Sequence, residues 1–185
     1  YTNYSQQRDY RTDWEKYVVV QTPTSDMVDP ATGLAYDNVF IGNSPRGTLD
    51  SSLQGRPSST FNTDNVYTGF SNVTGGKGND LIVQGSIDLT YSAGRAGDDI
   101  IQGVERGNHY GGDDDDVIMG SGSDNFAPGY GDAGDDYITG VRSAFGGSGD
   151  DVIRDVRTAD GGNDDDIIFE VTGMAKGGAG DDVIY

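Results

Sequence analysis

A nine-residue pattern occurs seven times between residues 75 and 185 and constrains the fold of this chain more than any other feature. Each unit carries Gly at its first position, Asp at its sixth and Ile at its eighth. A repeated unit of this kind is typical of solenoids, in which every repeat packs on its two neighbours. The pattern therefore predicts an all-β solenoid, whose units begin at Gly75, Gly94, Gly111, Gly131, Gly146, Gly161 and Gly177.

Within one unit, the residue types predict a tight turn followed by a short strand. Glycine at positions one, two and four permits positive φ and lets main-chain carbonyl groups approach one another. The three residues after the aspartate are expected to form a strand with the Ile side chain pointing into the coil. A valine three residues after the Ile is expected to pack the return part of four coils, and these valines are Val104, Val141, Val156 and Val171.

The acidic residues point to a cation as the partner of this chain. Of 31 acidic residues 28 are Asp, and the short Asp side chain is favoured in turns. Residues 75–185 carry 23 acids and 7 bases, a net charge of −16, whereas residues 1–74 carry 8 acids and 5 bases. This charge disfavours a nucleic acid or an anionic membrane surface as a partner. No segment of the sequence reaches the roughly 18 apolar residues that a membrane span needs.

The pattern Gly-Gly-x-Gly-x-Asp-x-Ile-x resembles the calcium-binding repeat of the RTX (repeats-in-toxin) family. Units such as GGSGDDVIR from Gly146 carry the resemblance, and weaker echoes occur at residues 36–43 and 63–70. The resemblance implies a right-handed parallel β-roll whose glycine-rich turns bind Ca²⁺. It also implies a secreted bacterial protein, exported by type I secretion, that is extracellular or lies at the cell surface.

The expected calcium sites lie between successive coils. Calcium binds six to eight oxygen atoms at about 2.3–2.6 Å, more than one turn supplies, whereas two stacked turns can supply six. The six gaps between units therefore predict about six ions or more, bridged by position-six residues such as Asp136 and Asp151. The expected ligands occupy positions one, three and six of each unit: Gly75, Lys77, Asp80, Gly94, Ala96, Asp99, Gly111, Asp113, Asp116, Gly131, Ala133, Asp136, Gly146, Ser148, Asp151, Gly161, Asn163, Asp166, Gly177, Ala179 and Asp182.

The spacing of the units departs from the family pattern, in which nonapeptides follow one another in tandem. The unit starts are 19, 17, 20, 15, 15 and 16 residues apart, so each coil has one Gly-Asp turn and one variable return. We therefore expect one calcium-binding turn per coil and a single file of ions along one edge of the roll. The segment 120–126 is a candidate half-site on the second edge, and Arg95, Asp114, Asp132 and Asp164 leave the geometry of their turns open.

A metal-free solenoid is the alternative, because Asp–Gly turns need no ion. In such a solenoid Asp98 and Asp99 would stack on Asp115 and Asp116, and each uncompensated pair of charges would cost on the order of several kcal/mol. One Ca²⁺ in each of the six gaps would add 12 positive charges to the −16 of the repeat. The charge balance therefore favours calcium.

Residues 1–74 differ in composition and are predicted to form a β-rich N-terminal capping or interaction segment before the roll of residues 75–185. Strands are expected at 16–22 and 37–42. A segment that covers the first coil is favoured over a ligand site.

The sequence gives little sign of catalysis. It has no Cys, and its only His, His109, is expected at an arbitrary loop position. The Gly-x-Gly-x-x-Gly match at 129–134 runs into Asp-Asp-Tyr-Ile and not into a helix, so a dinucleotide site is not supported. Acid pairs for glycoside hydrolysis stay open, although the aspartates are better explained as calcium ligands. We interpret the chain as non-enzymatic.

These features predict a secreted calcium-binding structural protein, part of a surface layer, an extracellular filament or an adhesin, whose repeats fold on Ca²⁺. The alternative is a calcium-binding module of a larger secreted enzyme or toxin. Expected partners are Ca²⁺, cell-surface polysaccharide and copies of the chain itself. The last unit, Gly177 to Asp182, has no unit after it, so the aromatic N-terminal segment of another copy is a candidate for completing it head-to-tail.

Overall fold

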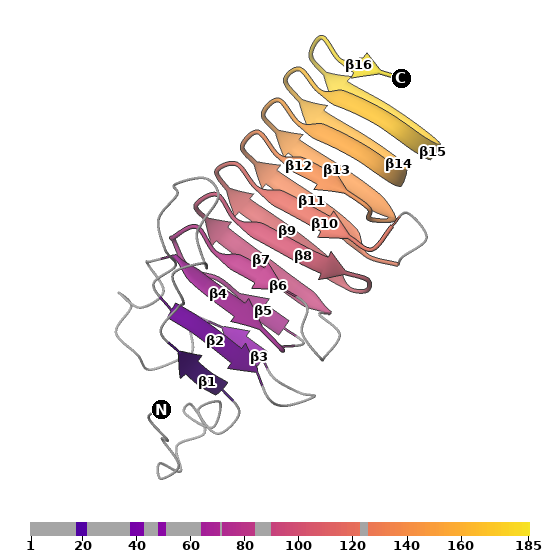
Figure 1. The fold of residues 1–185 in the computed structure, drawn as a ribbon. Helices are drawn as coiled ribbons and strands as arrows, with labels where there is room; N and C mark the ends of the chain where they lie inside the picture. The colour runs from indigo at the N-terminus through magenta and orange to yellow at the C-terminus, as the bar shows by residue number, and fades with distance from the viewer. Residues whose placement is uncertain are drawn as a thin grey trace.

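The protein is an all-β solenoid in the part of the chain that its computed structural model describes. This part comprises residues 18–21, 38–42, 48–50, 64–70, 72–83, 90–122 and 126–185. Sixteen strands and no helix occur in it, and successive coils stack along one axis (Figure 1). The predicted fold class is confirmed. These ranges also contain no helix that could cross a membrane.

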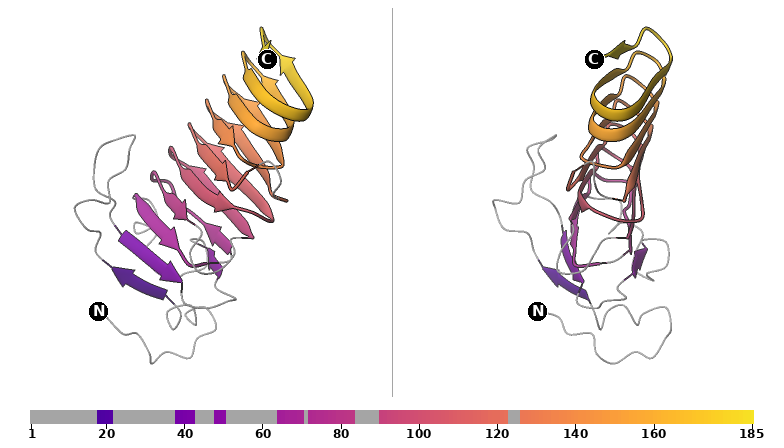
Figure 2. Two further views of the ribbon diagram at one scale, coloured as in Figure 1. Left: turned by 45° about the vertical axis from the view of Figure 1, so that its right-hand side comes forward. Right: turned by 90° about the vertical axis from the view of Figure 1, so that its right-hand side faces the viewer.

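Each coil contributes one strand to each of two stacks that face each other across a narrow interior (Figure 2). The front stack contains β2 (Asn38–Gly42), β4 (Asn65–Thr68), β6 (Leu81–Val83), β8 (Ile100–Val104), β10 (Val117–Gly120), β12 (Tyr137–Thr139), the first parts of β14 (Val152–Asn163) and β15 (Ile167–Ala179), and β16 (Val183–Ile184). The back stack contains β3 (Thr48–Asp50), β5 (Asn72–Thr74), β7 (Tyr91–Ala96), β9 (Asn108–Asp113), β11 (Pro128–Ala133), β13 (Ser143–Ser148) and the last parts of β14 and β15.

Strand pairing within both stacks is parallel, with equivalent positions of successive units in register. Ile118 of β10 pairs with Ile138 of β12, for example, and Ile138 pairs with Ile153 of β14. The strands β14 and β15 are the longest because their coils are short, and they stay paired around the return corner through Val156 and Val171. The repeat therefore sets the register.

The core is thin, with isoleucines of the front stack facing small side chains of the back stack. Six of the seven position-eight isoleucines are fully buried, and Ile184 in the last coil is 48% exposed. Three return valines are fully buried, and the fourth, Val171, is partly buried and packs against the core. The inward positions of the back stack are small in most coils: Val73, Ser92, Gly129, Ala144, Ala159 and Ala175.

His109 lies in β9 and not in a loop, so its expected position was wrong. Its side chain is fully buried, with Nδ1 2.8 Å from Ser92 Oγ and Nε2 2.8 Å from the carbonyl oxygen of Arg106. Burial lowers the pKa of His109 to about 4, so the ring is neutral at pH 7, Nε2–H donates to Arg106 and Nδ1 accepts the Ser92 hydroxyl. Both ring nitrogens are satisfied, which makes His109 a core residue.

The parallel stack extends to the N-terminal side of residue 75. The expected strands at 16–22 and 37–42 are confirmed as β1 (Val18–Gln21) and β2, which pair antiparallel at the end of the sheet. From β2 onward the front stack is parallel, with Val39 paired to Val66 and Val66 to Leu81. The aromatic N-terminal residues and the head-to-tail contact expected for them lie outside the described residues.

Candidate calcium-binding edge

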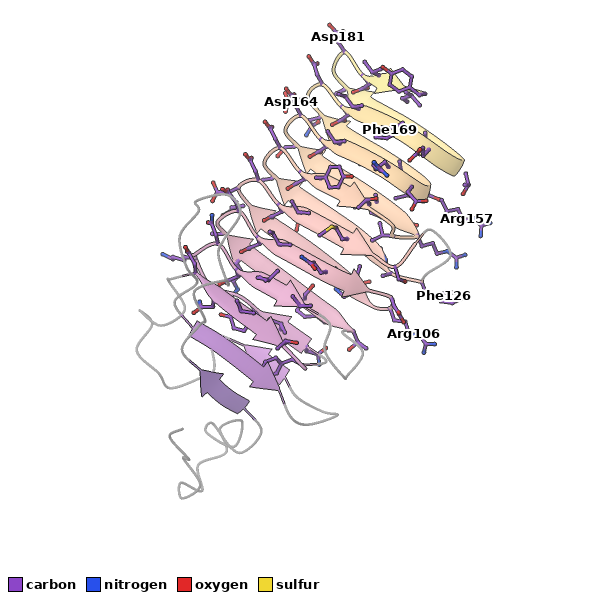
Figure 3. The ribbon with its side chains drawn as sticks, in the orientation of Figure 1. Arg106, Phe126, Arg157, Asp164, Phe169 and Asp181 are labelled. Carbon is purple, nitrogen blue, oxygen red and sulfur yellow. The ribbon has the colours of Figure 1, made fainter. Side chains whose placement is uncertain are left out.

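Positions one to six of all seven units stack along one edge of the solenoid, called the turn edge here. Asp164 and Asp181 project from this edge, whereas Arg106, Phe126 and Arg157 lie at the opposite, return edge (Figure 3). The candidate half-site at 120–126 belongs to the return edge, and its residues 123–125 lie outside the described part of the chain.

In the six units from Gly94 onward, positions two and four adopt positive φ in regular and irregular units alike. Gly147 and Gly149, at positions two and four of one unit, have φ of 130° and 122°. The four residues that depart from the family pattern also adopt positive φ: Arg95 (96°), Asp114 (78°), Asp132 (78°) and Asp164 (73°). Non-glycine residues in this region cost about 1–2 kcal/mol each, with Asp tolerated better than Arg. The six turns from Gly94 onward therefore keep one conformation despite these four residues, whereas Gly76 and Gly78 of the first unit do not have a positive φ.

The position-six aspartates form an inner ladder of hydrogen bonds between coils. In each gap, the main-chain N–H of one aspartate donates to Oδ1 of the position-six aspartate in the next coil, at 2.6–3.2 Å. The pairs are Asp80–Asp99, Asp99–Asp116, Asp116–Asp136, Asp136–Asp151, Asp151–Asp166 and Asp166–Asp182. One oxygen of each acceptor carboxylate is thus used to join coils.

The position-five residues form an outer ladder that runs in the opposite direction. Here Oδ1 of one coil accepts the position-five N–H of the next coil, at 2.8–3.3 Å. The acceptors are Asp64, Asn79, Asp98, Asp115, Asp135, Asp150 and Asp165. These residues were absent from the expected ligand set, and their repeated Asp at position five was the available signal. Both ladders explain the preference for Asp over Glu, because the shorter side chain matches the distance between coils.

The second oxygen of the inner aspartates is the unusual feature of this edge. Oδ2 is buried and has no hydrogen-bond partner in Asp99, Asp116, Asp136, Asp151 and Asp166. These five side chains are at most 1% exposed. An unpaired buried polar atom costs on the order of 1–3 kcal/mol, and more when it is charged. Five such atoms in a row therefore call for a partner that protein groups do not supply.

The glycines at position one line the space in front of these oxygens. A Cβ atom added at Gly131 would collide with Asp136 Oδ2 and lie 2.6 Å from the carbonyl oxygen of Gly146 in the next coil. At Gly75 the same atom would lie 2.5 Å from both Asp80 Oδ2 and the Gly94 carbonyl oxygen. All seven position-one glycines face the carboxylate of their own unit in this way. At Gly75, Gly131 and Gly146 the carbonyl oxygen of the next coil converges with this carboxylate on a point that only glycine leaves open.

Further carbonyl groups point across the gaps from positions two and four. A Cβ atom at Gly147 would overlap the carbonyl oxygen of Asp132, and one at Gly149 would overlap that of Gly134. The position-three residues from Ala96 onward pair in the back stack, whereas Lys77 lies outside the strands. The Ser148 carbonyl already accepts a hydrogen bond from Gly134 N at 2.9 Å. The structure therefore brings together positions one and six of the expected ligand set and adds the carbonyls of positions two and four.

This donor set fits a hard divalent cation such as Ca²⁺, which prefers carboxylate and carbonyl oxygens. The described residues contain no group of three or more His, Cys, Asp or Glu side chains arranged around a metal position. A cation in a gap would therefore be held by carboxylate and main-chain oxygens together. The atoms that the acidic side chains and carbonyl groups present to the gaps are oxygen atoms, the ligands that Ca²⁺ prefers.

The electrostatics of the edge oppose ionised aspartates in the absence of a cation. Burial, reinforced by the charge of neighbouring aspartates, raises the pKa of Asp99 to about 10 and that of Asp116 to about 8. The pKa values of Asp136 and Asp151 rise to about 7 for the same reasons. A bound cation would stabilise the ionised carboxylates, because an opposite charge favours the charged form.

Asp151 offers a direct test of the edge, because it joins two gaps. Its Oδ1 accepts the Asp136 N–H at 2.9 Å, and its own N–H donates to Asp166 at 3.0 Å. We expect Asp151→Ala to raise the calcium concentration at the folding midpoint by about tenfold or more, since a charged contact contributes about 1.5–3 kcal/mol. Asp151→Asn keeps the Oδ1 acceptor and should have a smaller effect. Circular dichroism during a Ca²⁺ titration gives these midpoints.

Asp155→Asn is the matched control, because it removes one carboxylate from the return edge of the same coil. Asp155 is exposed and has a φ of 49°, which Asn tolerates well. The calcium midpoint of this variant should equal that of the unmodified protein. Equal shifts for Asp151→Ala and Asp155→Asn would show that total charge, and not the turn edge, determines the response to calcium.

The chain matches no protein-family model, no curated protein and no solved structure. The turn edge is therefore defined by the residues of this chain alone. Its three independent features are the row of buried Oδ2 atoms, the position-one glycines in front of them, and the carbonyl groups that cross each gap.

Proposed function

We propose that this chain is a secreted, calcium-binding structural protein whose RTX-type β-roll folds on Ca²⁺ outside the cell. The observation that carries the proposal is the row of five buried carboxylate oxygens without partners. Each faces a glycine at position one of its own unit. Hydrogen-bonded Asp–Gly turns alone do not require such a row, whereas a file of divalent cations does.

The proposed ligands of one gap come from both coils that border it. In the gap between the units of Gly131 and Gly146, Asp136 supplies a carboxylate and Gly146 supplies a carbonyl oxygen. The carbonyl groups of Asp132 and Gly134 point into the same gap. Calcium would supply positive charge there. The two ladders hold the carboxylate and carbonyl oxygens of the chain at fixed positions around the gap.

Location outside the cell follows from the calcium concentration that such a roll needs. Extracellular calcium modules have dissociation constants around 10⁻⁴–10⁻³ M. Because metal binding and folding are coupled, a chain of this kind would stay unfolded where calcium is scarce and fold after export. The strongly acidic chain, with a net charge of −19, also resists association before calcium binds.

A structural role is supported by an apolar strip along the front face of the roll. The outward residue directly after each position-six aspartate is apolar in all seven coils, and these residues are in register. Ile167 is 42% exposed and Val183 is 41% exposed. The outer strip consists of Leu81, Ile100, Val117, Tyr137, Val152, Ile167 and Val183. We propose that a second copy of the chain packs on this strip, as sheets pack face to face at about 10 Å.

Charge selects the orientation of that second copy. A two-fold axis parallel to the roll axis places the turn edge of one copy beside the return edge of the other. A two-fold axis perpendicular to the roll axis would place two acidic turn edges together, which costs energy. The described part of the return edge carries equal numbers of bases and acids: Arg106, Arg142, Arg157, Glu105, Asp155 and Glu170. Parallel, side-by-side rolls are therefore the arrangement that we propose.

Cell-surface polysaccharide is the third partner that we propose, beside Ca²⁺ and a second copy of the chain. The back stack carries a partly exposed aromatic ladder in which Tyr110 and Tyr130 stack at 4.8 Å and Tyr130 and Phe145 at 4.9 Å. The ring planes are nearly parallel, at 12° and 9°. Because the ring faces cover one another, the ladder joins neighbouring coils and offers a sugar mainly ring edges.

The assembly state with and without calcium tests the structural role. Sedimentation velocity should show a larger species in millimolar Ca²⁺ and a single unfolded chain in EGTA. The variant Val152→Thr/Ile167→Thr/Val183→Thr keeps β-branched side chains but removes apolar surface, so it should fold on calcium and stay monomeric. A calcium-loaded protein that remains monomeric at high concentration would contradict the structural role while leaving calcium binding intact.

A further inference from the structure

Asn65 occupies position six of the coil that precedes the first glycine unit. The strand β4 pairs with β6 so that Val66 lies beside Leu81 and Tyr67 beside Ile82. The preceding residue, Asp64, acts as a position-five residue, because its Oδ1 accepts the Asn79 N–H at 3.0 Å. The stacked turns therefore continue to one further coil, in which an amide replaces the carboxylate.

The contacts of Asn65 differ from those in every later gap. Asp80 Oδ1 accepts two hydrogen bonds from Asn65, at 2.9 Å from the main-chain N and 3.2 Å from Nδ2. Asp80 Oδ2 accepts the Gly76 N–H at 2.9 Å. Both residues are fully buried. Asp80 is thus satisfied at both oxygens by protein N–H groups, whereas the next five position-six aspartates each have a bare Oδ2.

We propose that Asn65 ends the calcium row by replacing a cation with an amide donor. This inference rests on the proposed calcium binding. A gap bordered by two aspartates brings two carboxylates together and needs a positive charge, whereas the gap between Asn65 and Asp80 contains one carboxylate, whose Oδ1 receives two N–H donors from Asn65. This gap is closed without metal, and the coil of β4 is a metal-free end of the row.

The amide orientation follows from the same contact. Asn nitrogen and oxygen are assigned from their hydrogen-bond partners, and only Nδ2 can donate to a carboxylate. Asn65 Nδ2 lies 3.2 Å from Asp80 Oδ1. An aspartate in place of Asn65 would put a carboxylate oxygen, which can only accept, at the position of this nitrogen. Such a carboxylate would recreate the pair found in the later gaps. The presence or absence of this one amide therefore decides whether the gap takes up a cation.

Two reciprocal substitutions test the proposal by counting bound ions. Native mass spectrometry of the calcium-loaded full chain gives the count, and circular dichroism confirms that each variant is folded. Asn65→Asp should bind one more Ca²⁺ than the unmodified protein, because it adds the missing carboxylate. Asp136→Asn should bind one fewer, because it introduces the same amide in the middle of the row.

The outcomes separate this inference from the proposed function. An unmodified protein that binds no Ca²⁺ overturns both, whereas one that binds a row of ions while Asn65→Asp gains none overturns only the role of Asn65. If Asn65→Asp does not fold, Asn65→Ala decides. It should leave the ion count unchanged and speed hydrogen exchange of the Val66 and Thr68 amides, because the side-chain donor to Asp80 is lost. Unchanged exchange would overturn the proposal.

Discussion

Removal of Ca²⁺ with EGTA in mildly alkaline buffer is expected to abolish the parallel roll, and excess Ca²⁺ should restore it. Five aspartates have a buried Oδ2 without a partner, and they ionise under these conditions only at a high energetic cost because they lie buried in a row. Two charges 4–5 Å apart cost on the order of several kcal/mol even at an effective dielectric of about 20. Several such gaps together exceed the roughly 5–15 kcal/mol by which a domain is stable. Far-UV circular dichroism measures the loss of strand.

Acidification should partly replace calcium in the same experiment. The pKa values of Asp136 and Asp151 rise from 3.8 to about 7 on folding, mainly through burial. A carboxyl with a raised pKa favours the folded state fully below 3.8, and this contribution is lost as the pH rises through about 7. Strand content in EGTA should therefore increase when the pH is lowered from mildly alkaline to about 4.

Magnesium serves as the control for the chelation experiment. Mg²⁺ requires near-ideal octahedral geometry at about 2.0–2.1 Å and keeps several of its waters, so it should restore little strand at equal concentration. Equal recovery with Mg²⁺ would indicate general charge screening. A spectrum that does not change on chelation would contradict calcium-dependent folding and support the metal-free solenoid.

The parts of the fold that were predicted from sequence are those that repeat. Gly, Asp and Ile recur at fixed positions in seven units, so the strand after each turn and the inward direction of Ile138 or Ile153 follow from one local pattern. The back-stack residues that precede position one have no such pattern, since the thin interior accepts small side chains of several kinds opposite the isoleucines. His109 was misplaced for this reason: its strand is defined by pairing with neighbouring coils, and its partners Ser92 and Arg106 are not marked by any motif.

The two ladders could not be predicted for a different reason. Their hydrogen bonds join residues 15–20 positions apart, and their opposite directions depend on which coil each carboxylate faces. The sequence shows a weak echo of the repeat at residues 63–70, but it does not show that Asn65 donates a hydrogen bond to Asp80. Only the contact between Asn65 and Asp80 distinguishes an amide that donates to its neighbour from one that is exposed on a turn.

Two alanine substitutions on β11 should differ strongly in their effects on stability and on calcium binding, although they lie two residues apart. Gly131→Ala places a Cβ atom against Asp136 Oδ2 and 2.6 Å from the Gly146 carbonyl oxygen, so it occupies the space proposed for an ion. We expect loss of one Ca²⁺ and destabilisation by at least the roughly 1–3 kcal/mol that overpacking costs. Urea unfolding at saturating Ca²⁺, together with an ion count by native mass spectrometry, measures both effects.

Gly129→Ala is the matched control, because neither glycine has a positive φ and the backbone accepts alanine at both positions. Its Cβ atom would lie 3.2 Å from a methyl group of Ile118 and 3.3 Å from one of Ile138, in the apolar interior. The next coil already carries Ala144 at the same register. The change in stability should therefore stay within about 1 kcal/mol, with the ion count unchanged. If Gly131→Ala retained every ion, the space in front of Asp136 could not be the calcium position, and the buried carboxylates would need another explanation.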